Sequence, residues 1–110
     1  MGKKIFQSKV SSGRDSDVCG LTGNMANKPR MNELANKRGL GLLLGGTPVT
    51  ISGALQTSLT NSSVTESTAK TAIANANGSV LFSNSNITFK DLADSYCGIN
   101  KNTQIIFIYD

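Results

Sequence analysis

Residues 104–109 read Gln-Ile-Ile-Phe-Ile-Tyr, an apolar run in which β-branched residues are prominent. A run of this kind predicts a buried β-strand. At the edge of a sheet the same run would recruit another chain, because an edge strand has unpaired backbone groups. We therefore expect a buried strand here, and in a homo-oligomer we expect it to form the joint between copies.

A hairpin or a bent strand is expected upstream of this run. Residues 79–83 (SVLFS) and 86–89 (NITF) are apolar segments, and the residues between them, Asn84 and Ser85, favour a turn. Residues 90–97 (KDLADSYC) then have the composition of two helical turns. The C-terminal third of the chain is thus expected to combine short strands with a short helix.

A longer helix is predicted in the middle of the chain. Ser63 and Glu66 have the spacing of a capping box, and the alanine-rich residues 67–76 follow them. Asn77 and Gly78 are residues that commonly end a helix. Because the apolar residues of this helix are mostly alanine, it is suited to close packing against another backbone.

The N-terminal part of the chain shows no sustained apolar period. Residues 1–46 are polar, basic and rich in glycine, and apart from two helical turns at 31–37 they predict an extended arm. The run GLGLLLGG at 39–46 has neither of the glycine spacings that hold phosphates, so we interpret it as a flexible connector. A short strand is expected at 49–52.

These expectations define one small domain with an arm. We predict an α+β or mainly β body at residues 47–110, built of short strands with one or two short helices, preceded by the extended arm at residues 1–46. The chain has no Trp, two Tyr and four Phe, which is little for a core. Ordering each residue costs about 1–2 kcal/mol that apolar burial must offset, so we expect oligomerisation to assist stability.

The net charge of +4 is unevenly distributed. Residues 1–40 hold eight basic and three acidic residues, giving +5, whereas residues 41–110 hold three basic and four acidic residues, giving −1. The candidate arm contacts to nucleic acid or an acidic surface are Lys3, Lys4, Lys9, Arg14, Lys28, Arg30, Lys37 and Arg38. Aromatic residues that would stack on bases are scarce there, so any such contact is expected to be electrostatic and non-specific.

The residues of common catalytic sites are missing. The chain has no histidine, which removes the commonest general base and the zinc sites that mix Cys and His. Cys19 and Cys97 have no metal-binding spacing and are expected to be free thiols. Asp91 and Asp94 fall on one helical face, but two ligands are too few for a hard cation. We therefore expect no enzymatic activity, no cofactor and no metal.

Residues 86–96 (NITFKDLADSY) resemble a short element of bacteriophage virion proteins, especially tail-associated ones. In that element an apolar strand end leads to an Asp-Leu helix start, an aromatic residue and a glycine; Gly98 comes one residue late for the last position. The resemblance implies a small virion protein held in a symmetric assembly. The alternative is that its apolar residues form the core of a strand-helix unit. The candidate assembly anchors are Ile87, Phe89, Leu92, Tyr96, Ile105 and Phe107.

The expected function is that of a non-enzymatic structural component of a phage capsid or tail, made in the host cytoplasm. Its partners would be copies of itself and other virion proteins. No membrane contact is expected, because apolar stretches such as residues 40–44 are far shorter than a membrane span. The alternative is a small nucleic-acid-binding or packaging accessory protein that uses the basic arm. A bound metal or cofactor would favour a third interpretation, a subunit of a shared active site.

Overall fold

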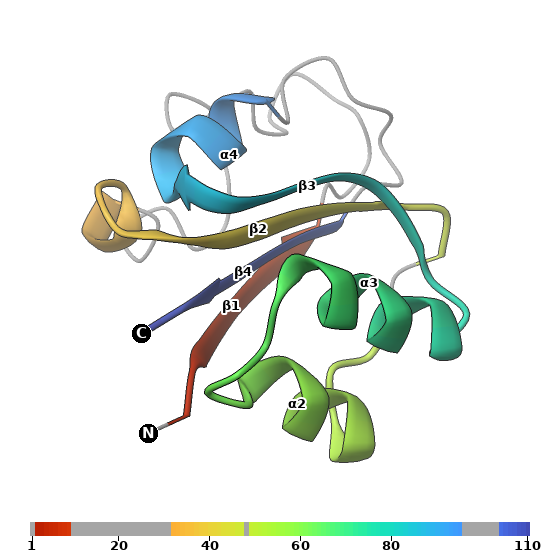
Figure 1. Cartoon of the computed structure of the whole chain (residues 1–110). Helices are drawn as coiled ribbons and strands as arrows, with labels where there is room; N and C mark the ends of the chain where they lie inside the picture. Colours follow the sequence, from red (N-terminus) through yellow and green to blue (C-terminus); the bar gives the residue numbers. More distant parts are fainter. Residues whose placement is uncertain (1, 10–31, 48, 96–103) are drawn as a thin grey trace.

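The protein is an α+β domain built on one antiparallel sheet of four strands (Figure 1). The computed structural model describes residues 2–9, 32–47, 49–95 and 104–110. The strands, in the spatial order β1-β4-β2-β3, are β1 (Lys4–Lys9), β4 (Gln104–Tyr109), β2 (Arg38–Gly45) and β3 (Ser79–Thr88). The helices are α2 (Gly53–Thr60), α3 (Glu66–Asn75) and α4 (Phe89–Ser95), with a short helical turn at residues 32–34. The predicted fold class is confirmed.

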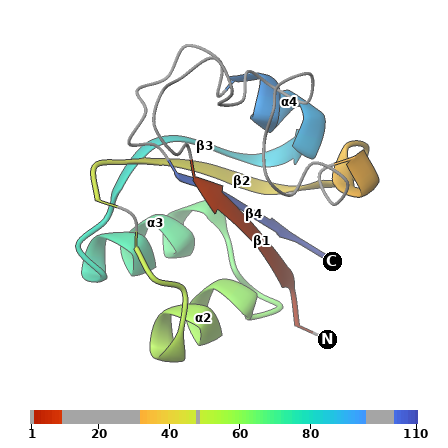
Figure 2. The ribbon, with the colours of Figure 1, turned by 180° about the vertical axis from the view of Figure 1, so that it is seen from behind.

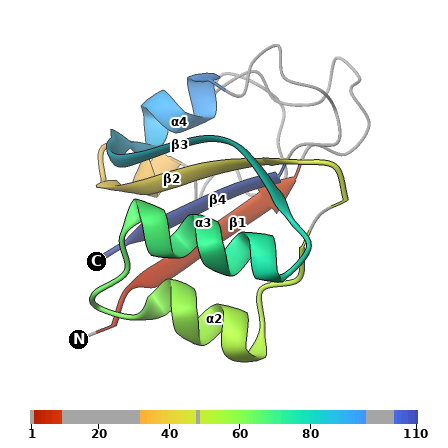
Figure 3. The same cartoon turned by 45° about the vertical axis from the view of Figure 1, so that its right-hand side comes forward.

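Helices cover both faces of the sheet. Helices α2 and α3 lie side by side across one face, whereas α4 lies against the other (Figures 2 and 3). Each face has its own apolar cluster, one containing Leu59 and Ile73 from α2 and α3, the other containing Leu34 and Leu92. The two central strands are therefore enclosed on both sides.

Strand β4 is the buried strand that its sequence predicts. All six of its residues are buried, with Ile106 and Ile108 in the α2/α3 cluster and Ile105, Phe107 and Tyr109 in the α4 cluster. It lies between β1 and β2 and pairs antiparallel with both. The expectation that this strand joins copies of the chain is wrong, because both of its edges are already paired within the chain.

The glycine-rich run expected to be a flexible connector is instead a central strand, β2. Leu40, Leu42 and Leu44 lie in the α2/α3 cluster, whereas the two residues between them, Gly41 and Leu43, face the α4 side. A Cβ at Gly41 would lie 2.9 Å from Ile87 Cγ2 and 3.0 Å from Leu92 Cδ2. The glycine therefore allows α4 to approach the backbone of β2, and Gly–Leu alternation marks a strand with a narrow side and a bulky side.

The N-cap of helix α3 lies two residues later than predicted, at Thr65 instead of Ser63. Thr65 is the N-cap: its Oγ1 accepts from Thr68 N at 3.2 Å, and its own N–H donates to Thr68 Oγ1 at 2.8 Å. The box therefore joins Thr65 to Thr68, and Ser63 with Glu66 does not form it. At the other end Asn77 has a φ of 64°, and Gly78 N donates to Ile73 O, so the predicted stop is confirmed.

The expected boundary between arm and body is also wrong. Residues on both sides of position 46 build the same sheet, because β1 and β2 come from the supposed arm. Residues 49–52 form no strand; instead the buried Gln104 side chain accepts from Val49 N and donates to Val49 O, each at 3.0 Å. Helix α2 was not expected. The predicted bent strand is confirmed as β3, and the helix expected at 90–97 is α4.

Candidate interaction edge of the sheet

Strand β3 forms one edge of the sheet and is irregular at two places. Phe82 lies opposite Leu43, and Val80 lies opposite Leu44, so Leu81 is an extra residue in a β-bulge. A second register shift accompanies the step from Gly39 to Gly41 on the partner strand. Both irregularities add residues to β3, and its outer side pairs with no other described strand.

Two large apolar side chains are exposed at the first bulge. Within the described residues, Leu81 and Phe82 are the large apolar side chains that stay exposed, at 56% and 37%. Leu81 lies over Gly45, where an added Cβ would be 3.0 Å from its Cδ1, just as Leu92 of α4 lies over Gly41. Both exposed side chains thus extend the apolar α4 side of the sheet outward to its edge.

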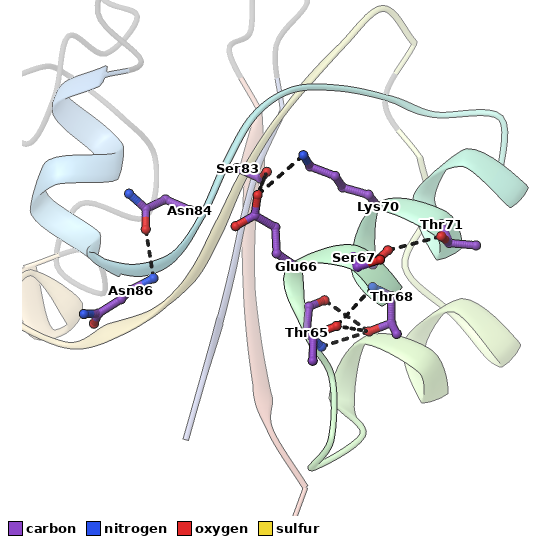
Figure 4. Close-up of polar contacts among 9 residues, drawn as sticks. All are labelled: Thr65, Glu66, Ser67, Thr68, Lys70, Thr71, Ser83, Asn84 and Asn86. Atoms are coloured by element: carbon purple, nitrogen blue, oxygen red, sulfur yellow. Dashed lines mark hydrogen bonds and ion pairs between the residues drawn. The ribbon is translucent and has the colours of Figure 1, made fainter.

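The next part of β3 is closed by polar contacts from its own chain (Figure 4). The Glu66 carboxylate, from the first turn of α3, accepts a hydrogen bond from Ser83 Oγ at 2.8 Å. Lys70 Nζ lies 3.4 Å from Glu66 Oε2. The bond from Ser83, with smaller contributions from Lys70 and Ser85, lowers the pKa of Glu66 despite partial desolvation.

The outer edge of β3 therefore has two halves of different character. In the closed segment, residues 83–86, Glu66 holds the strand and Asn84 Oδ1 accepts from Asn86 N at 2.9 Å. In the open segment, residues 79–82, the edge carries two exposed apolar side chains instead. The chain has no charged residue between Lys70 and Lys90, so neither segment is protected by charge.

Four basic residues of the supposed arm lie at one end of the sheet. Lys4 opens β1, Lys37 precedes β2 and Arg38 opens it, and the exposed side chains of these three make no ion pair among the described residues. Lys3 Nζ lies 2.9 Å from Asp110 Oδ1. Lys9 ends β1, whereas Arg14, Lys28 and Arg30 lie outside the described residues. Four of the eight predicted cations thus lie at one end of the sheet, in or beside strands rather than in an extended arm.

A small pocket of about 230 Å³ lies beside this basic end, on the α2/α3 side. Its lining includes the cations Lys3 and Arg38 and the carboxylates Glu66 and Asp110. Both carboxylates already have partners, because Glu66 binds Ser83 and Lys70 while Asp110 pairs with Lys3. The mixed charge makes this pocket a weak receptor for either an anion or a cation.

Most candidate assembly anchors are core residues. Ile87, Phe89, Leu92, Ile105 and Phe107 are at most 8% exposed and all belong to the α4 cluster. The ring centroids of Phe89 and Phe107 are 5.2 Å apart in an edge-to-face arrangement. Their burial leaves no surface for a neighbouring subunit, so they are not assembly anchors; Tyr96 lies outside the described residues. The residues that sequence reasoning missed are Leu81 and Phe82, and the signal was an apolar segment without charge.

No protein-family model matches the chain, and no curated protein or solved structure matches it. Within the described residues, no three acidic or thiol side chains come together as metal ligands. In the same part of the chain, no helix has the length and apolar character needed to cross a membrane.

Proposed function

We propose that this protein is a non-enzymatic assembly subunit of a bacteriophage virion, in its capsid or tail, and that it docks through the open segment of β3. The observation that carries the proposal is the pair of exposed apolar side chains, Leu81 and Phe82, on an edge strand without charge. Natural sheets normally cover such an edge or protect it with lysine, proline or an inward charge. An edge left open and apolar is suited to a partner strand.

The chemistry of the open segment fits a contact surface. Strand addition supplies main-chain hydrogen bonds, and side chains on alternate positions supply specificity. Interface centres are poor in charged residues and rich in aromatic ones, and the open segment has no charged residue and one phenylalanine, Phe82. Ser79 and Ser83 on either side can form a polar rim.

The virion assignment rests on the resemblance of residues 86–96. This element covers the last three residues of β3 and all of α4, and Thr88 Oγ1 accepts from Asp91 N at 3.1 Å and so caps the helix. The capped strand-to-helix junction holds β3 against α4, because Phe89 and Leu92 are fully buried beneath it. In the proposed subunit this element is a rigid support for the docking edge, and it makes no contact with the neighbour.

The competing proposal is a nucleic-acid-binding accessory protein. It is favoured by the exposed Lys4, Lys37 and Arg38 at one end of the sheet. Binding through phosphates releases counterions, so it weakens steeply as salt rises, whereas apolar assembly persists. Salt dependence therefore separates the two proposals.

The test compares the solution mass of the full chain with that of the double variant Leu81→Ser/Phe82→Ser by light scattering, at low and high salt. We expect the wild-type chain to form oligomers that persist at high salt and the variant to be monomeric. Ala54→Ser/Ala74→Ser, at exposed helix positions, is the matched control and should assemble like wild type. Oligomers unaffected by the edge variant, or retention on DNA that high salt abolishes, would reject the proposed docking edge.

A further inference from the structure

We propose that the occupant of the open segment is the same segment of a second copy, paired antiparallel about a two-fold axis at Leu81. This inference rests on the proposed function and names the partner of its docking edge. A two-fold axis at Leu81 brings residues 79–83 of the two copies side by side in opposite directions, with Leu81 and Phe82 of both copies on the α4 side. Leu81 then meets its own counterpart.

The order of polarity in this segment supports a second copy as the occupant. Residues 79–83 read Ser-Val-Leu-Phe-Ser, so small polar residues flank three apolar ones and the pattern is the same in both directions. A two-fold interface requires such self-complementarity, because each residue contacts what its counterpart contacts. A different partner would place no such requirement on the sequence of β3.

Charge also favours a second copy at this edge. Self-pairing brings identical residues together, so any charge near the axis would face a like charge. No charged residue occurs between Lys70 and Lys90. Self-pairing of the open segment therefore brings no like charges together, although the chain carries a net charge of +4. The lysines at both ends of β1 would repel their counterparts if β1 paired with itself.

The bulge adds apolar contact to the proposed pair. Leu81 and Phe82 both lie on the α4 side of the sheet, because the extra residue shifts the alternation by one position. A two-fold axis perpendicular to the sheet keeps the α4 sides of both copies together. Two leucines and two phenylalanines would then meet across the axis and form an apolar centre.

The closed segment limits the length of this interface. Glu66 already binds Ser83, so the contact between copies is confined to the open segment, residues 79–82. An interface this short falls at the low end of protein–protein contacts, below roughly 1,200 Å², and is expected to be weak and dependent on concentration. Repetition of the contact within a closed particle would strengthen it through effective concentration.

A charge-swap experiment tests the two-fold arrangement. Leu81→Lys and Leu81→Glu are each expected to weaken dimerisation by at least about tenfold, because like charges would face each other across the axis. Mixing the two variants should restore dimers, and these should dissociate as salt rises. Leu81 is exposed, so both variants should retain the far-ultraviolet circular dichroism of wild type. A mixture that stays monomeric while wild type dimerises would overturn the arrangement.

A cross-linking experiment separates this inference from the proposed function. Leu81→Cys should cross-link to itself between copies, whereas Ala54→Cys, on α2, should not. The tryptic peptide of residues 71–90 contains no native cysteine, so its self-linked product identifies the pair without interference from Cys19 or Cys97. Oligomers that require Leu81 and Phe82 but give no such product would reject self-pairing and leave the docking edge intact. Oligomers indifferent to both residues would reject both proposals.

Discussion

The two edges of the sheet are defended in different ways. Strand β1 carries Lys4 and Lys9 at its ends, preceded by Lys3, so a second β1 would bring cations together. Strand β3 has no charge and is closed over only half of its length, by the bond from Ser83 to Glu66 and the bond between Asn86 and Asn84. Charge protects an edge against any copy of itself, whereas a side-chain cap protects only the residues that it reaches. The unprotected remainder, residues 79–82, is where we place the contact.

The strongest test of this comparison removes the core that holds both edges in place. Phe107→Ala should cost about 3–5 kcal/mol of unfolding free energy, because Phe107 is fully buried against Phe89 and Tyr109. Phe82→Ala, at the open segment, should cost under about 2 kcal/mol, because its ring is already 37% exposed. Urea unfolding of the two variants measures the difference. Equal losses would mean that β3 is as enclosed as β4.

A second test removes the charge that protects β1. The change is made in the Leu81→Lys variant, in which association through β3 is prevented. There Lys4→Ile should create new association through β1 and raise the oligomer fraction several-fold at equal concentration. Lys4 lies at an exposed edge position opposite Tyr109, so the change should leave the fold intact. Lys37→Ile, outside any strand, is the control. Light scattering in which both variants remain monomeric would show that β1 is protected by something other than lysine.

A third test loosens the helix that closes half of β3. Thr65→Ala removes the N-cap of α3 and should cost about 1 kcal/mol, within the usual range of roughly 0.5–2 kcal/mol. The same change should weaken the hold of Glu66 on Ser83, because Glu66 is the first residue of that helix. Thr71→Ala, which loses a bond to Ser67 O on the exposed face, should change stability by only a few tenths of a kcal/mol. Equal effects in chemical denaturation would exclude a special role for the cap.

The smallest expected effect concerns pH. Since the folded state lowers the pKa of Glu66 below 4.5, its carboxylate stabilises the fold above that pH, and the contribution is lost as pH falls through the lowered pKa. Glu66→Gln should therefore melt slightly below wild type at pH 7, and the gap should close as pH falls below 4.5. Asp94→Asn, whose exposed ion pair with Lys90 lies on α4, serves as the comparison. A gap that is constant with pH would contradict the contact between Glu66 and β3.

The sequence predicted those elements whose signal is local. Strand β4 was placed at its observed bounds because five consecutive apolar residues, Ile105 to Tyr109, have few alternatives to a buried strand. Helix α3 was found from its alanines and its Asn-Gly stop, although two threonines, rather than Ser63 and Glu66, form its cap. These features depend on neighbours within a few positions along the chain, which is the range over which sequence patterns are informative.

The missed elements depend on contacts that are distant in sequence. Strand β2 looked like a connector because glycine usually signals a turn, yet Gly41 is required by the approach of Ile87 and Leu92. Strand β1 has few apolar residues, and its pairing partner lies about a hundred positions away. The anchors were misassigned for the same reason: periodicity identifies Phe89 and Phe107 as apolar but does not say which neighbour buries them. Leu81 and Phe82 face the same side of the sheet because of a bulge, and the sequence pattern alone does not reveal a bulge.

The position of β4 between β1 and β2 has a consequence for folding. The ladder that joins β1 to β4 pairs Lys4 with Tyr109, so the two ends of the described chain meet side by side (Figure 1). During synthesis β1 and β2 are made before β4, the strand that lies between them in the sheet. Until β4 is made, the edges of β1 and β2 that pair with it have no partner strand. Contacts of such long sequence range slow folding, and premature pairing of β1 with β2 would be a kinetic trap. Refolding should therefore be slow for a domain of this size, with the insertion of β4 as the rate-limiting step.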